Sequence, residues 1–152
     1  MNPSSAQSQP AASTRRTPPG ITGHCLCGAV TITVAGEHDP HVGACHCRMC
    51  QRWSGGLFLS FTADAAAITV TGEVTRYRSS AFAERAFCPR CGSPVFARSG
   101  DEIEVNLGSL DAPDQFKPTY ELWTIRRESW LPPFPLAKRY EGDRDASSRF
   151  EA

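Results

Sequence analysis

Seven cysteines in three tight groups are the feature that most constrains this chain of 152 residues. An odd number of cysteines cannot all pair in disulfides within one chain, and close grouping is typical of metal or redox chemistry. The groups are Cys25 with Cys27, Cys45 with Cys47 and Cys50, and Cys88 with Cys91. A chain of this length has room for one compact domain, so we expect the fold to bring some of these groups together.

The first and third groups together supply the ligands of a closed zinc site. In an extended strand, Cys25 and Cys27 would point to the same face. The segment from Cys88 to Gly92 has the spacing of a zinc knuckle, in which a tight turn directs both thiolates inward. Two such pairs complete the tetrahedral shell of a structural zinc ion. Buried thiols or a redox-active CxxC pair are the alternatives.

The middle group, Cys45, Cys47 and Cys50, offers three thiolates and no obvious fourth ligand. Three protein ligands with one open position are typical of catalytic zinc, because the open position accepts water or a substrate atom. His46 alternates with two of the ligands and is expected to pack near them without completing the shell. Alternatively, the three thiolates join a cysteine of another subunit or form one shared cluster. The sequence therefore predicts two zinc ions per chain, the second of them accessible to substrate.

Composition limits the classes of partner. Sixteen lysines and arginines balance sixteen aspartates and glutamates, so a nucleic-acid partner is not expected. A mean hydropathy of -0.34 indicates a globular protein without a membrane role. The N-terminal stretch lacks the apolar segment of a secretory signal. We therefore expect a reducing, cytoplasmic location, where clustered cysteines more often bind metal than form disulfides.

The rest of the sequence predicts a mainly β fold of stacked antiparallel sheets with little helix. Short runs of alternating apolar and polar residues, bounded by glycine and proline, are typical of half-buried strands. We expect hairpins that join 67–70 to 74–78 and 95–97 to 103–107. Short helical turns are expected around 47–53 and 112–116, and twelve prolines and twelve glycines interrupt the remainder.

Domain boundaries follow from composition. Residues 1–19 are rich in Ser, Ala, Pro and Gln and are expected to form a disordered tail. Residues 20–141 are expected to form the zinc domain, and 142–152 a polar C-terminal tail.

Two further sets of side chains bear on the core and on substrate. Four arginines lie within a few positions of a cysteine and can offset thiolate charge or bind an anionic substrate; they are Arg48, Arg52, Arg85 and Arg90. Large aromatic residues are expected to pack in the core, with an aromatic-lined cleft as the alternative; they are Trp53, Trp123, Trp130, Phe58, Phe61, Phe82, Phe87 and Phe96.

Four motifs in order resemble the glutathione-dependent formaldehyde-activating enzyme family, which also includes centromere protein V. They run over Gly23–Val30, Cys45–Gly55, Arg85–Ser93 and Gly108–Asp111, within a resemblance that extends from about Ile21 to Tyr140. The resemblance implies stacked β-sheets shared with methionine-R-sulfoxide reductases, two zinc ions and carbon-sulfur lyase chemistry. By position, it assigns a structural zinc to Cys25, Cys27, Cys88 and Cys91. It assigns a catalytic zinc to Cys45, Cys47 and Cys50.

The activity that the resemblance implies is that of an S-(hydroxymethyl)glutathione synthase. A small thiol, glutathione in the family, would be activated at the open zinc for addition to an aldehyde, formaldehyde. A zinc-stabilised binding module without turnover is the alternative from a different class. Methionine sulfoxide reduction would need a catalytic cysteine outside the three groups, and residues 92–152 contain none.

Overall fold

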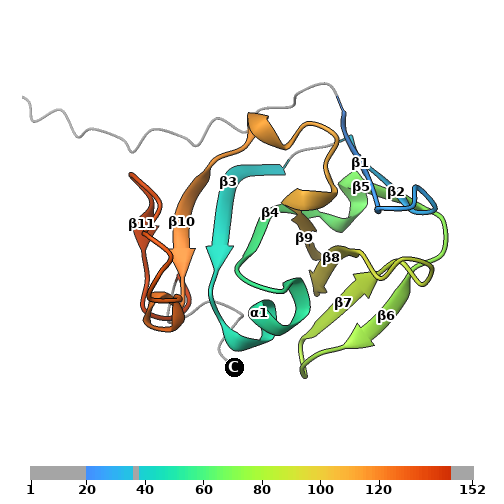
Figure 1. Ribbon diagram of the computed structural model, residues 1–152. Coiled ribbons are helices and arrows are strands. Elements are labelled where there is room, and N and C mark those ends of the chain that lie inside the picture. Colours follow the sequence, from blue (N-terminus) through green and yellow to red (C-terminus); the bar gives the residue numbers. More distant parts are fainter. Residues whose placement is uncertain (1–19, 36–37, 145–152) are drawn as a thin grey trace, which may run out of the picture.

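The computed structural model describes residues 20–35 and 38–144 and contains two β-sheets and one α-helix within them (Figure 1). The smaller sheet has the order β1 (Ile21–His24), β2 (Thr31–Val34) and β5 (Ile68–Thr71). The larger sheet has the order β11 (Lys138–Arg139), β10 (Pro118–Leu122), β3 (His38–Cys45), β4 (Phe58–Asp64), β9 (Glu102–Asn106), β8 (Pro94–Ser99), β7 (Ala83–Phe87) and β6 (Thr75–Arg78). The helix is α1 (Arg48–Ser54), and the short 3-10 turns are Ala65–Ala67, Leu107–Ser109, Pro113–Gln115 and Thr124–Arg126.

The predicted fold class is confirmed: the protein is a small, mainly β domain with little helix. Most neighbouring strands are antiparallel, as in the β3–β4 and β4–β9 pairs. One edge of the larger sheet differs, because β10 runs parallel to both β3 and β11. The helix and the 3-10 turn Pro113–Gln115 lie where the sequence predicted short helical turns.

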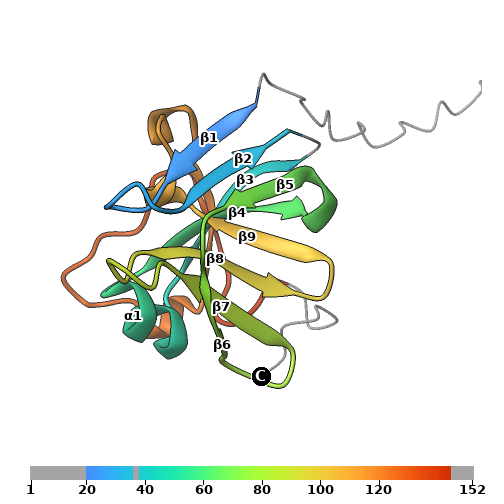
Figure 2. The same ribbon diagram turned by 90° about the vertical axis from the view of Figure 1, so that its right-hand side faces the viewer.

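The main core lies between the two sheets. In β2 the alternating pattern buries Ile32 and Val34, and these side chains belong to the same apolar cluster as Phe61 of β4 and Val105 of β9. Figure 2 shows the smaller sheet lying over this part of the larger one. Full burial of each such side chain stabilises the fold by roughly 1.5–3 kcal/mol.

One of the two predicted hairpins is wrong. The β8–β9 hairpin is present, but β5 pairs with β2 of the smaller sheet while β6 pairs with β7 of the larger one. The chain therefore crosses between sheets near Gly72, where a Cβ atom would lie 2.1 Å from the carbonyl oxygen of Ala29. This crowding and a φ of 96° explain why a glycine is needed at this position. Gly72 allows the chain to pass close to Ala29 and does not form the turn of a hairpin.

The aromatic residues divide between core, pocket wall and surface. Phe58, Phe61 and Phe96 are fully buried, as predicted. Trp130 is 77% exposed, so its placement in the core was wrong. Trp53 and Trp123 are partly buried and pack against a separate small cluster that contains Cys47, Cys50 and Phe58. Two of the three tryptophans thus lie beside cysteines and outside the main core.

The predicted tail at 1–19 lies outside the described residues, as do residues 145–152 of the predicted C-terminal tail. The described part contains no helix that could cross a bilayer, since α1 is an α-helix of seven residues and a span needs about 20.

Candidate metal and substrate site

The structure brings the seven cysteines into two sulfur clusters, and within each cluster the Sγ atoms lie within 4.8 Å of one another. The first, here called the closed cluster, consists of Cys25, Cys27, Cys88 and Cys91. The second, the open cluster, consists of Cys45, Cys47 and Cys50. All seven are free thiols. The cysteines assigned to each site from the sequence are therefore the ones that the fold assembles.

Sulfur spacing in the closed cluster fits a tetrahedral zinc ion. The Sγ atoms of Cys25 and Cys27 are 3.6 Å apart, and those of Cys27 and Cys88 are 3.8 Å apart. Four sulfurs at about 2.3 Å from one zinc ion would form a tetrahedron with edges of about 3.8 Å. A disulfide would instead require about 2.05 Å. Both the donor set and the spacing therefore suit zinc.

Both cysteine pairs of the closed cluster lie in turns of the same form. The amide of Gly28 donates to the carbonyl of Cys25, and the amide of Gly92 donates to the carbonyl of Cys88, each at 2.9 Å. The two glycines have φ values of 75° and 74°. The expectation that the first pair lies in a strand was wrong, because β1 ends at His24. A turn brings both sulfurs close to one point. It also lets a backbone amide that follows the turn donate to a sulfur, as Val30 does to Cys25 at 3.2 Å.

Ser93 joins the two turns. Its hydroxyl oxygen accepts a hydrogen bond from the amide of Leu26 at 3.0 Å and lies 3.2 Å from the sulfur of Cys91. Its carbonyl accepts from the amide of Cys88. The contact with the Ser93 hydroxyl lowers the pKa of Cys91 to about 5, which favours the thiolate form that binds metal.

The open cluster is built at the start of α1. Cys45 ends β3, Cys47 is the N-cap residue of the helix, and Cys50 lies in its first turn. The amide of Cys50 donates to the sulfur of Cys47 at 3.4 Å. Hydrogen bonds among the three thiols lower the pKa of Cys47 and raise that of Cys45. Without a cation the cluster therefore favours one thiolate, and a divalent metal would allow all three to ionise.

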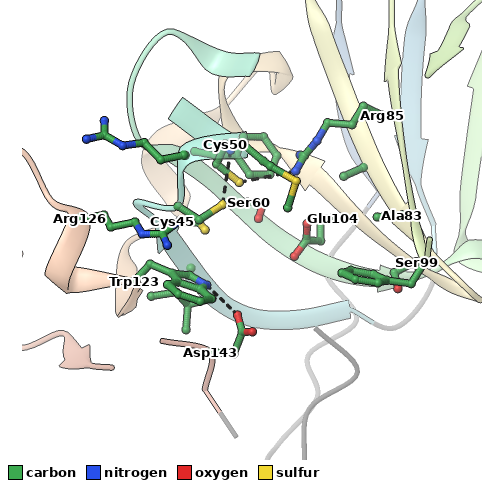
Figure 3. Close-up of a pocket in the computed structure, with 18 of the residues that line it drawn as sticks. Cys45, Cys50, Ser60, Ala83, Arg85, Ser99, Glu104, Trp123, Arg126 and Asp143 are labelled. Atoms are coloured by element: carbon green, nitrogen blue, oxygen red, sulfur yellow. Dashed lines mark hydrogen bonds between the residues drawn. The ribbon is translucent and has the colours of Figure 1, made fainter. Parts of the chain in front are cut away.

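The open cluster lines a pocket of about 260 Å³ (Figure 3). Its walls also carry four arginines and two acidic residues, namely Arg48, Arg85, Arg98, Arg126, Glu104 and Asp143. Among the described residues, no cysteine of the closed cluster lines this pocket. The two clusters thus differ in access as well as in the number of ligands.

Arg85, on β7, is the arginine that contacts the open cluster. Its Nη2 lies 3.8 Å from the sulfur of Cys50, and its guanidinium lies 4.6 Å from the centre of the Trp53 ring. The side chain is 8% exposed, and its buried Nη1 has no hydrogen-bond partner among the described residues. A buried cation here offsets thiolate charge. A buried donor without a protein partner is free to bind a water molecule or a substrate group at this site.

The other arginines singled out from the sequence lie elsewhere. Arg48 lines the pocket and donates to the side-chain oxygen of Gln51 at 2.7 Å. Arg52 and Arg90 are exposed and do not line the pocket. Nearness to a cysteine in sequence therefore located two of the four pocket arginines.

A buried contact between a histidine and a glutamate lies next to the open cluster, because His46 stands between Cys45 and Cys47. His46 Nε2 lies 3.1 Å from Glu121 Oε1, and both side chains are fully buried. Glu121 also accepts from Arg127 at 3.2 Å and from the amide of Phe134 at 3.3 Å. Burial opposes ionisation, but the hydrogen bonds from His46 and Arg127 outweigh it and lower the pKa of Glu121. His46 is packed, as expected, and is not part of the sulfur cluster.

Residues after β10 form the opposite wall of the pocket. Trp123 has a φ of 57°, and its indole Nε1 donates to Asp143 Oδ1 at 3.0 Å. Its amide donates to the carbonyl of Gly142, and the guanidinium of Arg126 lies 4.8 Å from its ring centre. A left-handed tryptophan is an uncommon conformation, and such residues often mark functional sites.

Sequence reasoning missed Glu104, Asp143 and the Glu121 partner of His46. In β9 Glu104 alternates with the buried Ile103 and Val105. This pattern is the same whether the polar face meets solvent or a pocket. His46 lies 75 positions from Glu121, and no local signal identifies that contact.

Comparisons with known proteins identify the family of this chain. The model of the glutathione-dependent formaldehyde-activating enzyme family matches residues 20–126. An uncharacterized lyase of Schizosaccharomyces pombe (strain 972) is 34% identical over 79 residues, which are 51% of this chain and 57% of that protein. The chain thus matches little more than half the length of this relative. A crystal structure of a Rhodobacter sphaeroides protein is 25% identical, with a TM-score of 0.49, over 59% of this chain and 87% of that one. From the family match and the order of its motifs, this chain belongs to the glutathione-dependent formaldehyde-activating enzyme family.

Proposed function

We propose that this protein is a zinc-dependent carbon-sulfur lyase that resembles S-(hydroxymethyl)glutathione synthase and joins a small thiol, such as glutathione, to formaldehyde. The observation that carries the proposal is that the open cluster lines a pocket and the closed cluster does not. Membership of the family supports this activity, as does the name of the S. pombe lyase.

The two clusters would hold the two metal ions. Cys25, Cys27, Cys88 and Cys91 offer a complete shell for a structural zinc ion. The open cluster would hold the second, with a position left for the substrate sulfur. A zinc ion there supplies positive charge that lowers the pKa of an added thiol and favours its thiolate at neutral pH.

The pocket residues bind and orient the substrates. Glutathione carries two carboxylates, and the guanidinium groups of Arg48, Arg98 and Arg126 can pair with such groups. The apolar side chains of Phe58 and Leu122 cover part of the wall and exclude water. In the reaction, a bond forms between the thiol sulfur and the carbonyl carbon, and the carbonyl oxygen becomes a hydroxyl.

The proposed domain covers residues 20–141, and the described residues just beyond it contribute Asp143 to the pocket wall. A cytoplasmic location is part of the proposal, because seven free thiols and their metal ions require a reducing compartment.

Cobalt substitution tests the proposal directly. Adding glutathione should strengthen the sulfur-to-metal charge-transfer absorption, because a soft thiolate enters the open position. The glutathione analogue with serine in place of cysteine is the control ligand and should produce no such change. Cys50→Ser should abolish the response while the closed cluster keeps its metal. If no small thiol changes the spectrum, a zinc-stabilised binding module without turnover becomes the better description.

A further inference from the structure

We infer that Glu104 is the proton-transfer residue of this pocket: it takes the proton of the incoming thiol and delivers it to the aldehyde oxygen. The inference rests on the proposed function and names the group that would transfer the proton in that reaction.

Glu104 stands in the middle of the larger sheet. It lies on β9, opposite Thr62 of β4 and Ala97 of β8. Its neighbours Ile103 and Val105 point into the core, so the Glu104 side chain faces the other way, into the pocket. In Figure 3 its carboxyl group lies in the space between the cysteine side of the pocket and Asp143. A rigid central strand thus presents one carboxyl to the space where substrate would bind.

The surroundings of Glu104 suit a group that both accepts and releases a proton. Burial raises its pKa above the ordinary value for a glutamate, and the Arg85 cation on β7 opposes that rise. The negative charges of Cys47, Glu102 and Asp143 raise the pKa of Glu104 further. Among the described residues, none donates a hydrogen bond to this carboxyl, so it is not committed to a structural contact. A general acid–base works best when its pKa lies nearer to the working pH.

The other polar groups of the pocket are less suited to this step. The carboxylate of Asp143 accepts the indole hydrogen of Trp123. Burial raises the pKa of Tyr120 to about 12, so its phenol stays protonated near neutral pH and has no free site to accept the thiol proton. Arginines do not give up protons in proteins, and the cysteines are the proposed ligands. Among the described residues that line the pocket there is no histidine.

The proposed step balances without a co-reactant. The Glu104 carboxylate accepts the S–H proton as the thiol binds. The sulfur lone pair then forms the C–S bond, and the π electrons of the carbonyl group move to its oxygen. Glu104 returns the same proton to that oxygen, which leaves a hydroxyl and a carboxylate. Arg85 is a positioning residue here, because its positive charge favours the ionised form of both Cys50 and the Glu104 carboxyl.

Counting protons on thiol binding tests the inference without measuring turnover. Glutathione binding to the zinc-loaded protein is followed by calorimetry in buffers of different ionisation enthalpy. Wild type should release few protons, because Glu104 retains the one from the thiol. Glu104→Gln should release about one more proton per thiol bound. An infrared absorption from a protonated carboxyl should appear on thiol binding in wild type and be absent in the variant.

Turnover gives a second readout, with a matched control on the same strand. Glu104→Gln should lower kcat by about 100-fold or more. Its thiol affinity should rise more steeply with pH than that of wild type, because the thiol proton then goes to solvent. Glu102→Gln removes a carboxylate two positions away that does not line the pocket and that adds only a neighbouring charge to Glu104. It should keep the wild-type proton count and change kcat far less than Glu104→Gln does. If Glu104→Gln loses zinc or melts early, Glu104→Asp replaces it. This variant keeps a carboxyl and should retain the wild-type proton count while turnover slows.

The possible failures are distinguishable. Equal proton release by wild type, Glu102→Gln and Glu104→Gln, with equal kcat, would overturn the role of Glu104 and leave the proposed function standing. Failure of the wild-type protein to bind any small thiol would contradict the proposed function, and the role of Glu104 would fall with it.

Discussion

The two sulfur clusters use the same kind of ligand but differ in their surroundings. The closed cluster is held between two backbone turns that Ser93 joins. Among the described residues, none of its cysteines lines the pocket beside the open cluster. The open cluster has one sulfur fewer, a buried arginine beside it and a cavity in front of it. The comparison shows that identical donor atoms can be enclosed or can line a pocket, depending on where the fold leaves space.

Removing one closed-cluster ligand should have the largest effect on stability. A structural zinc site contributes on the order of 10 kcal/mol to folding, which is comparable to the whole stability of most domains. We expect Cys88→Ser to fold poorly or to melt far below wild type. Circular dichroism melting and zinc analysis of the purified protein would measure this. An unchanged melting temperature would show that the closed cluster does not stabilise the fold.

Loss of the buried Glu121 carboxylate should have the next largest effect. Glu121→Gln removes the carboxylate that pairs with Arg127 and Arg139 and contacts His46, and the loss of such charged hydrogen bonds costs about 2 kcal/mol. Chemical unfolding would measure the difference at neutral pH.

The pH dependence of this difference has a defined sign. The pKa of Glu121 is lowered in the folded state, so its stabilisation is present above the unfolded value of 4.5. It is lost as the pH falls through the lower folded value. The gap between wild type and Glu121→Gln should therefore narrow in acid, and a gap that widens there would contradict this assignment.

Loss of an open-cluster ligand should change stability less. Cys50→Ser should lower the zinc content from about two to about one per chain and abolish thiol binding, while the unfolding free energy changes by about 1 kcal/mol. Elemental analysis and melting curves, compared with Cys88→Ser, would measure this. The division into a structural and a reactive cluster fails if both variants lose the same stability.

The Ser93 contact should have the smallest effect. Ser93→Ala removes one hydrogen bond to Leu26 and the contact with Cys91, which is worth about 1 kcal/mol. Thiol binding at the open cluster should stay at the wild-type level. A loss of thiol binding in this variant would show that the two clusters are coupled.

Features set by short stretches of sequence could be predicted. The knuckle at Cys88 to Gly92, the helical turn after Cys47 and the β8–β9 hairpin all depend on neighbouring residues. Their local geometry leaves few alternatives, so spacing and turn residues were sufficient.

Features that depend on distant partners could not be predicted. Whether β6 pairs with β5 or with β7 is decided by the path of the chain between the two sheets, and local alternation does not contain that information. The CxC spacing at Cys25 is typical of a strand, but contacts with distant residues such as Ser93 hold this segment in a turn. Glu104 could not be predicted for the same reason, because a strand that faces a pocket and a strand that faces solvent show the same alternation of apolar and polar residues.

The two clusters also differ in how much chain each one closes into a loop, which bears on how the protein acquires metal while it folds. The open cluster spans only the positions from Cys45 to Cys50, so an unfolded chain can bind a cation there at little entropic cost. The closed cluster joins Cys27 to Cys88, 61 positions apart, and needs both turns in place. A metal ion that also binds the unfolded chain adds less to stability than one that binds the native state alone. We therefore expect a nascent chain to bind metal first at the open cluster. Metal should bind to the closed cluster only after the chain has folded.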